Sequence, residues 1–336
     1  MMPDLAAQRP WMQKGWLEQA SAWIHLELQR QGIHVTGPIE QPHAHSPNVL
    51  RAPSTAGAVY FKASQPSLAH EAALTNALWR WRPDCMPPVL AVDFERGWML
   101  TRDLGATLRS LVHSTRDLQH YHRVLPLYAE VQIDLISRVN ELLKLGALDR
   151  RLTMLPHDYE QLLTETDALR LDHPHGLSTE EHRRLCRFAP EFRAMCQRLA
   201  GYRIPETLHH EDFHDANIFV HNNRYTFSDW GESGVSHPFC TWLVTSRVIA
   251  WRLELTNDAP ELVRLRDIYL EPWTRYESRE NLIAASKMAY RVGMVCRALT
   301  WRLLLADVDE PVKAEYAEAV SDWLREFLNY ETAPSA

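Results

Sequence analysis

Hydrophobic residues are spaced differently in the two parts of the chain. Residues 16–31 read as a helix, and a segment broken by prolines follows it. Residues 48–52 (NVLRA) and 58–63 (AVYFKA) are short β-prone runs on either side of the turn sequence PSTAG. The second run alternates only loosely, but its valine, tyrosine and phenylalanine favour a strand. We therefore expect one helix followed by two neighbouring strands.

The segment HEAALTNALWRW predicts a second helix. Its apolar residues recur at steps of three and four, which places on one helix face Ala73, Leu74, Ala77, Leu78 and Trp81. The next segment, PPVLAVDFERGWMLTRDLG, reads as two more short strands joined by a turn of Asp, Glu, Arg and Gly. This part of the chain therefore predicts a small unit of mixed strands and helices.

After Gly105 the pattern is mostly helical. A long amphipathic helix ending near Gly146 is predicted by apolar residues at Leu125, Tyr128, Val131, Leu135, Val139 and Leu142. The same periodicity indicates helices at about residues 158–170, 179–199, 240–255, 259–269, 280–305 and 311–330. One β-hairpin interrupts this part, because IFV and YTFSD flank HNNR, whose Asn-Asn pair tolerates positive φ angles. We expect an α+β chain with a small front and a large helical back.

Composition excludes several classes of protein. The chain has 336 residues, 46% of them hydrophobic, which is enough for two lobes with their own cores. Its formal net charge of -7 argues against a nucleic-acid partner. The five cysteines are scattered and form no CxxC pair, as in a reducing compartment. With no apolar signal segment and no membrane-spanning run of about 18 residues, the sequence predicts a soluble cytoplasmic protein without a membrane partner.

The stretch LHHEDFHDANIFVHNNRYTFSDW, residues 208–230, holds four histidines and four acidic residues. A zinc site could use His209, His210, Asp212 and His214, but HxHxDH and HExxH patterns are missing and no cysteine lies near. For His209 and His214 individually, a solvated or hydrogen-bonded loop residue explains the sequence at least as well.

Phosphoryl transfer fits the complete stretch better. This chemistry needs a carboxylate to orient or deprotonate a hydroxyl, and oxygen ligands that hold Mg²⁺ against phosphates. Asp212 and Asn217 lie on one loop that enters a strand, and Asp229 ends the returning strand. A hairpin between Asn217 and Asp229 would bring both beside each other. The sequence thus predicts that three oxygen-bearing side chains converge.

These residues carry a family resemblance. The motif H-x-D-x-x-x-x-N, followed by a strand pair and Asp-Trp, resembles the aminoglycoside phosphotransferase/choline kinase family, whose HGDLHPGN…IDW appears here as HEDFHDAN…SDWGES. The resemblance covers about residues 48–245, and more loosely the helical C-terminus. It implies a bilobal protein-kinase-like fold, with an N-lobe of antiparallel sheet at residues 1–104 and a mainly helical C-lobe at residues 105–336.

The resemblance also implies a nucleotide site. Lys62 would contact the phosphates and Glu71 would hold it in place, and Lys62 is the only lysine between Lys14 and Lys144. Backbone groups of the lobe linker would meet the adenine of ATP, or the base of GTP, near Leu100, Thr101 and Asp103.

Catalytic roles follow from the same resemblance. Asn217 and Asp229 would hold Mg²⁺, and Asp212 would accept or direct the proton of a small-molecule hydroxyl. His210 would brace the loop. Glu211 replaces the small residue that is usual before the aspartate. We expect its side chain to face away, although a second carboxylate beside Asp212 would raise the pKa of Asp212.

The acceptor is less well defined. Glu232 and His237 are candidates for substrate contact, but a loop cap for Glu232 and a structural role for His237 explain them equally well. Tryptophans and acidic residues of the helical part would suit an amino sugar, an aminoglycoside or a choline-like acceptor, or they would pack the core.

A catalytically silent nucleotide-binding protein is the alternative function. A protein kinase is disfavoured because DFG reads Asp229-Trp230-Gly231 and no APE segment follows. The sequence does not indicate an oligomeric state.

Overall fold

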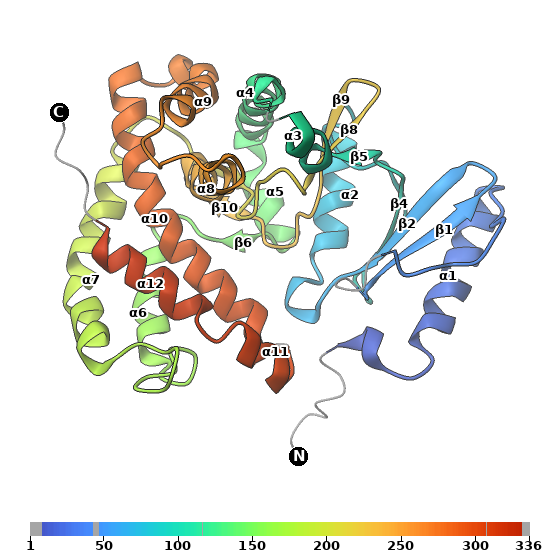
Figure 1. Ribbon diagram of the computed structural model, residues 1–336, viewed down its shortest axis with the longest axis horizontal. Helices are drawn as coiled ribbons and strands as arrows, with labels where there is room; N and C mark the ends of the chain where they lie inside the picture. The colour runs from blue at the N-terminus through green and yellow to red at the C-terminus, as the bar shows by residue number, and fades with distance from the viewer. Residues whose placement is uncertain (1–8, 43–46, 116, 307, 331–336) are drawn as a thin grey trace. The chain divides into compact units, whose positions relative to one another are not determined.

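The computed structural model describes residues 9–42, 47–115, 117–306 and 308–330. The start of the chain, where the sequence predicts no signal segment, lies outside these ranges. Contacts group the chain into two compact units, whose elements are labelled in Figure 1. The first unit comprises residues 1–108, 216–231 and 307–309, and the second comprises residues 109–215, 232–306 and 310–336.

A four-stranded antiparallel sheet forms the centre of the first unit, with the order β1-β2-β4-β3. The register sets Phe61 of the second strand opposite Leu100 of the fourth. The strands predicted from the sequence are confirmed, and so is the α+β class. Their bounds are β1 (Val49–Ser54), β2 (Gly57–Ala63), β3 (Val89–Asp93) and β4 (Trp98–Arg102).

Helix α1 (Trp16–Arg30) covers this sheet with aromatic side chains. The ring centroid of Phe61 lies 6.0, 5.7 and 5.3 Å from those of Trp16, Trp23 and Trp98, and all of these residues are buried. Successive residues of a strand point to opposite faces, so burial of Phe61 directs Lys62 to the other face of β2. Helix α2 (Glu71–Trp81) follows a short 3₁₀ turn at Pro66–Leu68.

The predicted hairpin is confirmed as β8 (Ile218–His221) and β9 (Arg224–Phe227), with β5 (Ala106–Thr107) beside it. Asn222 and Asn223 have φ angles of 47° and 63°, as a two-residue type I′ turn requires. By its contacts this hairpin belongs to the first unit, whereas the sequence placed it in the C-lobe. The lobe boundary at residue 104 stays a prediction.

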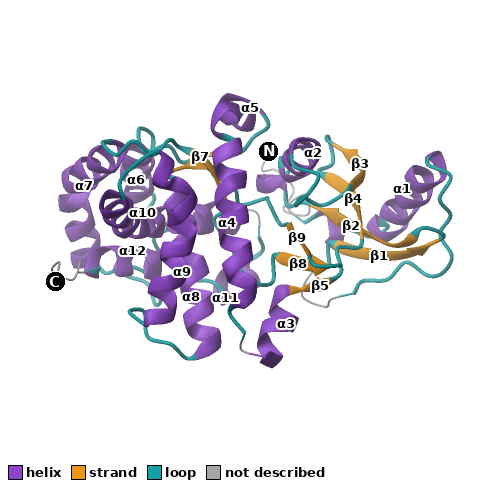
Figure 2. Cartoon of the chain, turned by 90° about the horizontal axis from the view of Figure 1, so that it is seen from above, coloured by secondary structure: helices purple, strands orange, loops and turns teal. Residues whose placement is uncertain are grey.

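The second unit is built from helices around α10 (Arg279–Ala306), which contacts α6, α7, α8, α9 and α12 (Figure 2). In the described ranges, no helix is both long enough and apolar enough to cross a membrane. The helix bounds are α3 (Leu108–Thr115), α4 (Gln119–Asp134), α5 (Val139–Lys144), α6 (Leu155–Thr164), α7 (Thr179–Ala200), α8 (Trp242–Leu253), α9 (Pro260–Leu270), α11 (Glu310–Glu315) and α12 (Ala319–Asn329).

Three predicted helices are wrong in extent. The helix expected at about residues 158–170 spans Leu155–Thr164 instead. The single helix expected up to Gly146 is divided by a 3₁₀ turn at Ile136–Arg138, and the one expected at 311–330 is divided into α11 and α12. A 3₁₀ turn repeats every three residues, so it keeps side chains three apart on one face. The apolar spacing therefore continues through Ile136–Arg138 and does not reveal that the α-helix ends.

A second small sheet was also missed by the prediction that the hairpin is the only β structure after Gly105. It consists of β6 (Leu148–Asp149), β10 (Gly234–Ser236) and β7 (Thr207–His209), in that order. Strands of two or three residues are too short to show alternation. Gly234 permits the pairing, because a Cβ atom there would lie 2.5 Å from the carbonyl oxygen of Leu148.

We predict that Phe61→Ala lowers the free energy of unfolding by about 3–5 kcal/mol, because it empties the centre of the aromatic cluster. Phe94→Ala is the matched control, since that side chain is 59% exposed. Urea denaturation followed by circular dichroism measures both variants. Equal loss of stability in the two would show that the cluster does not stabilise the first unit.

Candidate active site

Lys62 joins three elements of the first unit. Its Nζ atom donates hydrogen bonds of 2.6 Å to Glu71 Oε1, at the start of α2, and of 2.6 Å to Asp229 Oδ1, after β9. Glu71 is buried, and its second oxygen accepts a 3.0 Å hydrogen bond from the Ser64 hydroxyl. Burial opposes the charge on Lys62, but the carboxylates of Asp229 and Glu71 outweigh it and raise the pKa of the amine.

The backbone at Asp229 explains how its carboxylate reaches the lysine. Asp229 has a φ angle of 68°, in the left-handed region that few residues other than glycine adopt. This turn directs the chain away from the ladder of β9 directly after Phe227. Gly231 then passes close to α2, because a Cβ atom there would lie 3.2 Å from Glu71 Oε2.

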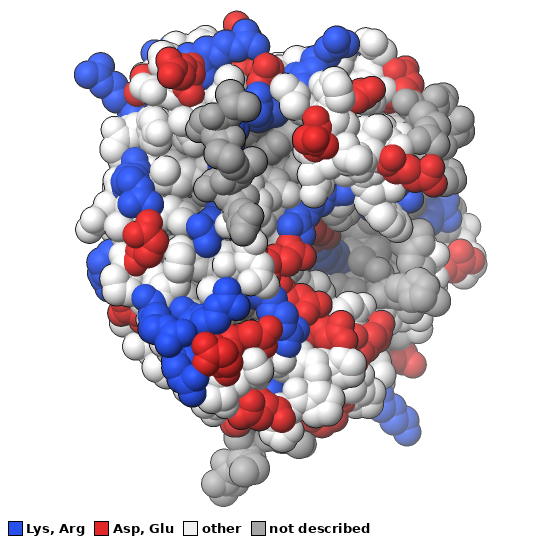
Figure 3. Space-filling model, turned by 60° about the vertical axis from the view of Figure 1, so that its left-hand side comes forward, with Lys and Arg blue, Asp and Glu red and all other residues white. Residues whose placement is uncertain are grey.

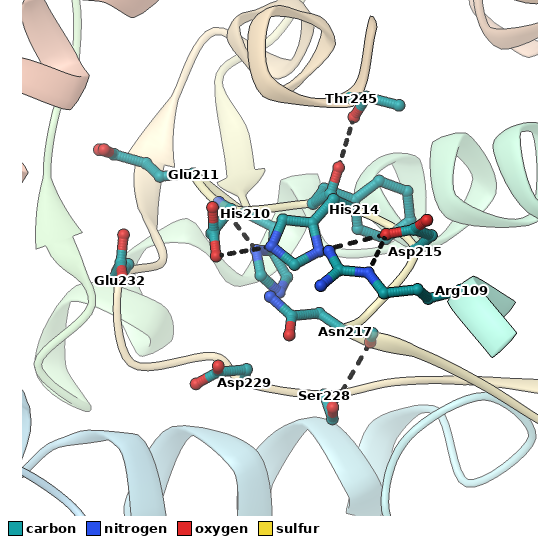
Figure 4. A network of polar contacts seen from close by, with 12 residues as sticks. Arg109, His210, Glu211, His214, Asp215, Asn217, Ser228, Asp229, Glu232 and Thr245 are labelled. Carbon is teal, nitrogen blue, oxygen red and sulfur yellow. Dashed lines mark hydrogen bonds and ion pairs between the residues drawn. The ribbon is translucent and has the colours of Figure 1, made fainter. Parts of the chain in front are cut away.

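Asn217 lies at the same end of the hairpin as Asp229. Its carbonyl oxygen accepts a 2.9 Å hydrogen bond from the amide of Ser228, the residue before Asp229, and Figure 4 shows this pair of strand ends. The sequence reasoning about these two residues thus agrees with the observed backbone pairing. An amide and a carboxylate are the oxygen donors that Mg²⁺ prefers. Among the described residues there is no group of three or more His, Cys, Asp or Glu side chains that could hold a metal ion.

The predicted linker residues lie in different surroundings. Leu100 is buried in the sheet core and Thr101 is nearly so, and both pair in the interior of β4. Asp103 follows the strand and is exposed, and its Oδ1 atom accepts a 2.9 Å hydrogen bond from the amide of Gly105. Of the three, Asp103 is the one that a solute can reach, and the contact of this segment with a base stays a prediction.

In the second unit, His210 is buried and fixes the loop that carries Asp212. The amide of His210 donates a 3.0 Å hydrogen bond to the Tyr128 hydroxyl, and its ring nitrogen Nδ1 accepts one of 3.2 Å from the amide of Asp212. Its ring also packs edge-on against Phe213. These contacts agree with the interpretation of His210 as a brace.

Asp212 is held as a carboxylate. Burial favours its neutral form, but the hydrogen bond from His214, the charge of that histidine and the charge of Arg297 together lower its pKa. The Nε2 atom of His214 lies 3.1 Å from Asp212 Oδ2. The expectation that Glu211 raises the pKa of Asp212 is therefore wrong, since nearby positive charges dominate.

Glu211 is buried and turns toward α10. It accepts a 2.7 Å hydrogen bond from the Thr300 hydroxyl and lies 3.8 Å from the Nε atom of Arg150. Burial raises the pKa of its carboxyl group, although Arg150 and Arg297 oppose the shift. Arg297 also donates a 3.5 Å hydrogen bond to the backbone carbonyl of Glu211.

The two candidates for substrate contact are engaged within the second unit. Glu232 accepts a 2.5 Å hydrogen bond from Arg297, which pairs its carboxylate with α10. His237 is 0% exposed, and its Nδ1 atom accepts a hydrogen bond from the Phe239 amide. Burial lowers the pKa of His237 to about 3. These facts favour the structural alternative for His237.

The tryptophans of the second unit divide between core and surface. Trp242 and Trp273 are buried, whereas Trp251 at the end of α8 is 72% exposed.

The sequence did not predict the roles of two basic residues of this unit, His214 and Arg297. His214 lies only two residues after Asp212, but a role as an ordinary loop residue explained it equally well, whereas Arg297 lies far along the chain and gives no local signal.

The fold is that of the bilobal, protein-kinase-like small-molecule kinases, as comparison with solved structures establishes. Choline kinase LicA from Streptococcus pneumoniae matches with a TM-score of 0.60 at 11% identity, covering 93% of this chain and 100% of that chain. A choline/ethanolamine kinase family protein from Mesorhizobium loti matches with a TM-score of 0.54 at 18% identity, covering 88% of this chain and 90% of that one.

A third similar structure is amicoumacin kinase hAmiN in complex with AMP-PNP, Ca²⁺ and Ami. Its TM-score is 0.57 at 11% identity, covering 98% of this chain and 96% of that chain. No protein-family model matches the sequence, and a search of curated proteins finds no match. The likeness is therefore one of fold, and it agrees with the resemblance carried by the HEDFHDAN motif.

We predict that Arg297→Met lowers the free energy of unfolding by about 3–5 kcal/mol, because it removes one partner from a buried ion pair. Arg302→Met, on the same helix, breaks a surface pair with Glu165 and is expected to cost at most about 1 kcal/mol. Urea unfolding of both variants measures the difference. Similar small losses in the two would contradict the role of Arg297 as the anchor of Glu232.

Proposed function

We propose that this protein is an ATP-dependent phosphotransferase that moves the γ-phosphoryl group of ATP to a hydroxyl of a small molecule. The observation that carries the proposal is the position of Lys62, whose amine binds both Glu71 and Asp229 at 2.6 Å. A lysine fixed on a strand by a helix carboxylate can neutralise nucleotide phosphates without losing its own place. GTP is the alternative donor.

Asp229 and Asn217 are suited to hold Mg²⁺ in this reaction. Both offer oxygen atoms at one end of the hairpin, and Asp229 is half exposed on its side chain. Bound Mg²⁺ would neutralise charge on the transferring phosphoryl group, and it commonly keeps several water ligands, so few protein ligands suffice. The structure of amicoumacin kinase hAmiN in complex with AMP-PNP and Ca²⁺ supports a nucleotide with a divalent cation for this fold.

Asp212 is the proposed acceptor for the hydroxyl proton. Its low pKa keeps it ionised at neutral pH, so it is a weak base. When the transition state of phosphoryl transfer is loose, orienting the attacking hydroxyl matters more than a strong base. A carboxylate with a low pKa can therefore fill this role. His210 contributes by fixing the backbone on both sides of Glu211.

A small hydroxyl compound that carries a positive charge is the proposed acceptor, such as an amino sugar, an aminoglycoside or a choline-like molecule. The net charge of -7 favours a cation, and the similar structures include a choline kinase. On the face displayed in Figure 3, basic and acidic side chains lie next to each other without a continuous basic field, which does not suit nucleic acid. A cytoplasmic location would supply the nucleotide.

We predict that Asp212→Asn lowers transfer of labelled γ-phosphate from Mg-ATP by about 100-fold or more, because a positioned base contributes about 10²–10⁴-fold. Binding of Mg-ATP should stay within about twofold, since the γ-phosphate ligands are unchanged. The assay uses choline, aminoglycosides, amino sugars and a fractionated metabolite extract as acceptors.

The control for this assay is His157→Gln, an exposed position of α6. A product that vanishes only in Asp212→Asn supports the kinase. Nucleotide binding without any product in the wild-type protein would instead support the silent nucleotide-binding alternative. A product formed from GTP but not ATP would correct the donor.

We predict that Asp229→Ala weakens binding of Mg-ATP by about 10- to 100-fold, because charge-assisted contacts contribute about 1.5–3 kcal/mol each. Titration calorimetry with and without Mg²⁺ separates the metal from the nucleotide. The effect should largely disappear when Mg²⁺ is omitted, and an equal loss under both conditions would refute the metal role. Asp93→Ala, on β3, is the matched control.

A further inference from the structure

His214 lies between two carboxylates of its own loop. Its Nε2 atom is 3.1 Å from Asp212 Oδ2, and its Nδ1 atom is 3.9 Å from Asp215 Oδ1. The side chains of His214 and Asp215 are 16% and 2% exposed, so this is a largely buried arrangement. The roles proposed above for the other residues of the loop leave His214 unused.

Asp215 is anchored from outside the loop. It accepts a 2.9 Å hydrogen bond from the Nε atom of Arg109, on α3 (Figure 4). It also lies 3.7 Å from the Nε atom of Arg252, on α8. The amide of Arg109 also donates a 2.9 Å hydrogen bond to the carbonyl oxygen of Asp215. The carboxylate that faces His214 is therefore fixed by two helices.

The residue before His214 is fixed as well. The carbonyl oxygen of Phe213 accepts a 2.8 Å hydrogen bond from the hydroxyl of Thr245, on α8. The ring of Phe213 is buried and stacks on Tyr128 at a centroid distance of 4.0 Å. Because Phe213 and Asp215 are both fixed, the backbone of His214 has little freedom to move. Its ring therefore stays between the carboxylates of Asp212 and Asp215.

Hydrogen-bond chemistry decides the charge that this position needs. A neutral imidazole has one N–H group, so when it donates to one carboxylate it turns a nitrogen lone pair toward the other. An imidazolium keeps its N–H toward Asp212 and presents a second N–H and a positive charge to Asp215, whose Oδ1 atom at 3.9 Å lies within ion-pair distance but beyond hydrogen-bond distance. Within the second unit, the charges of Asp212, Arg109 and Asp215 act on His214, and Arg252 lies next to Asp215. Burial opposes its charge, yet the bond to Asp212 and that aspartate's charge raise the pKa of His214.

We propose that His214 is a positioning residue, which as an imidazolium anchored on Asp215 holds Oδ2 of Asp212 and so orients that carboxylate for the acceptor hydroxyl. This inference rests on the proposed phosphotransferase function. The connection runs from two helices through Asp215 and His214 to Asp212. Loss of the proton from His214 would turn a lone pair toward one of the two carboxylates and loosen Asp212.

Steady-state kinetics as a function of pH tests the positioning role in the full chain. In the wild-type protein, kcat should fall as the pH rises through the pKa of His214, which lies above the usual value of about 6.5. His214→Gln should lower kcat by about 100-fold, the loss that a small misplacement can cause, with KM for Mg-ATP unchanged. Its kcat should also lack the alkaline fall.

His214→Lys is the rescue variant, because its charge persists to about pH 10. It should recover part of kcat and extend activity to higher pH, and His157→Gln should behave as the wild type. Wild-type kcat and an unchanged alkaline fall in His214→Gln would overturn the inference. A low kcat in both His214 variants with the same pH dependence as the wild type would overturn it as well, since that is the result of a structural role alone.

Nuclear magnetic resonance of labelled histidine separates this inference from the proposed function. The His214 signal is the one missing from His214→Gln, and its pKa should fall in Asp212→Asn, which removes the neighbouring negative charge. An unchanged titration in Asp212→Asn would overturn the pairing. If the titration shifts as expected but the wild-type protein transfers phosphate to no acceptor, the pairing stands, and the phosphotransferase proposal fails together with the catalytic role of His214.

Discussion

The amine of Lys62, shared between Glu71 and Asp229, is the interaction on which the arrangement of the first unit depends. Glu71 is buried, and a buried carboxylate requires a cationic or hydrogen-bonding partner. The shared lysine satisfies that requirement and at the same time connects β2, α2 and the segment after the hairpin. Burial of Phe61 in the aromatic core on one face of β2 places Lys62 on the other face. The packing of this core therefore also decides where the charge of Lys62 lies.

The second unit applies the same constraint to a loop with several carboxylates. Each of the three acidic residues that follow His210 in the loop lies beside a basic side chain. Arg297 and Arg150 lie near Glu211, His214 lies beside Asp212, and Arg109 and Arg252 lie beside Asp215. A buried carboxylate without a partner is costly, so the loop needs these basic side chains in order to fold with its acidic residues buried. They also keep Asp212 ionised, which the proposed chemistry uses.

Much of the fold could be predicted from local pattern. The four strands of the first sheet, its two helices and the Asn-Asn hairpin were all expected, because their turns and apolar spacing are decided by neighbours in sequence. The predictions were wrong where an element depends on residues far away in the sequence, or where its local pattern imitates another element. The turn at Ile136–Arg138 preserves the apolar spacing of a helix, and strands such as Gly234–Ser236 form only because a distant partner provides the pairing.

The sequence by itself determined the motif residues Asp212, Asn217 and Asp229, and the strand and helix that carry Lys62 and Glu71. Only the tertiary structure decided that Arg297 pairs with Glu232, that His237 is buried and that His214 faces two carboxylates. Motif spacing and apolar periodicity are properties of short segments, so a sequence displays them directly. The partner of a buried charge is chosen by packing between segments far apart in the chain, and no local pattern records that choice.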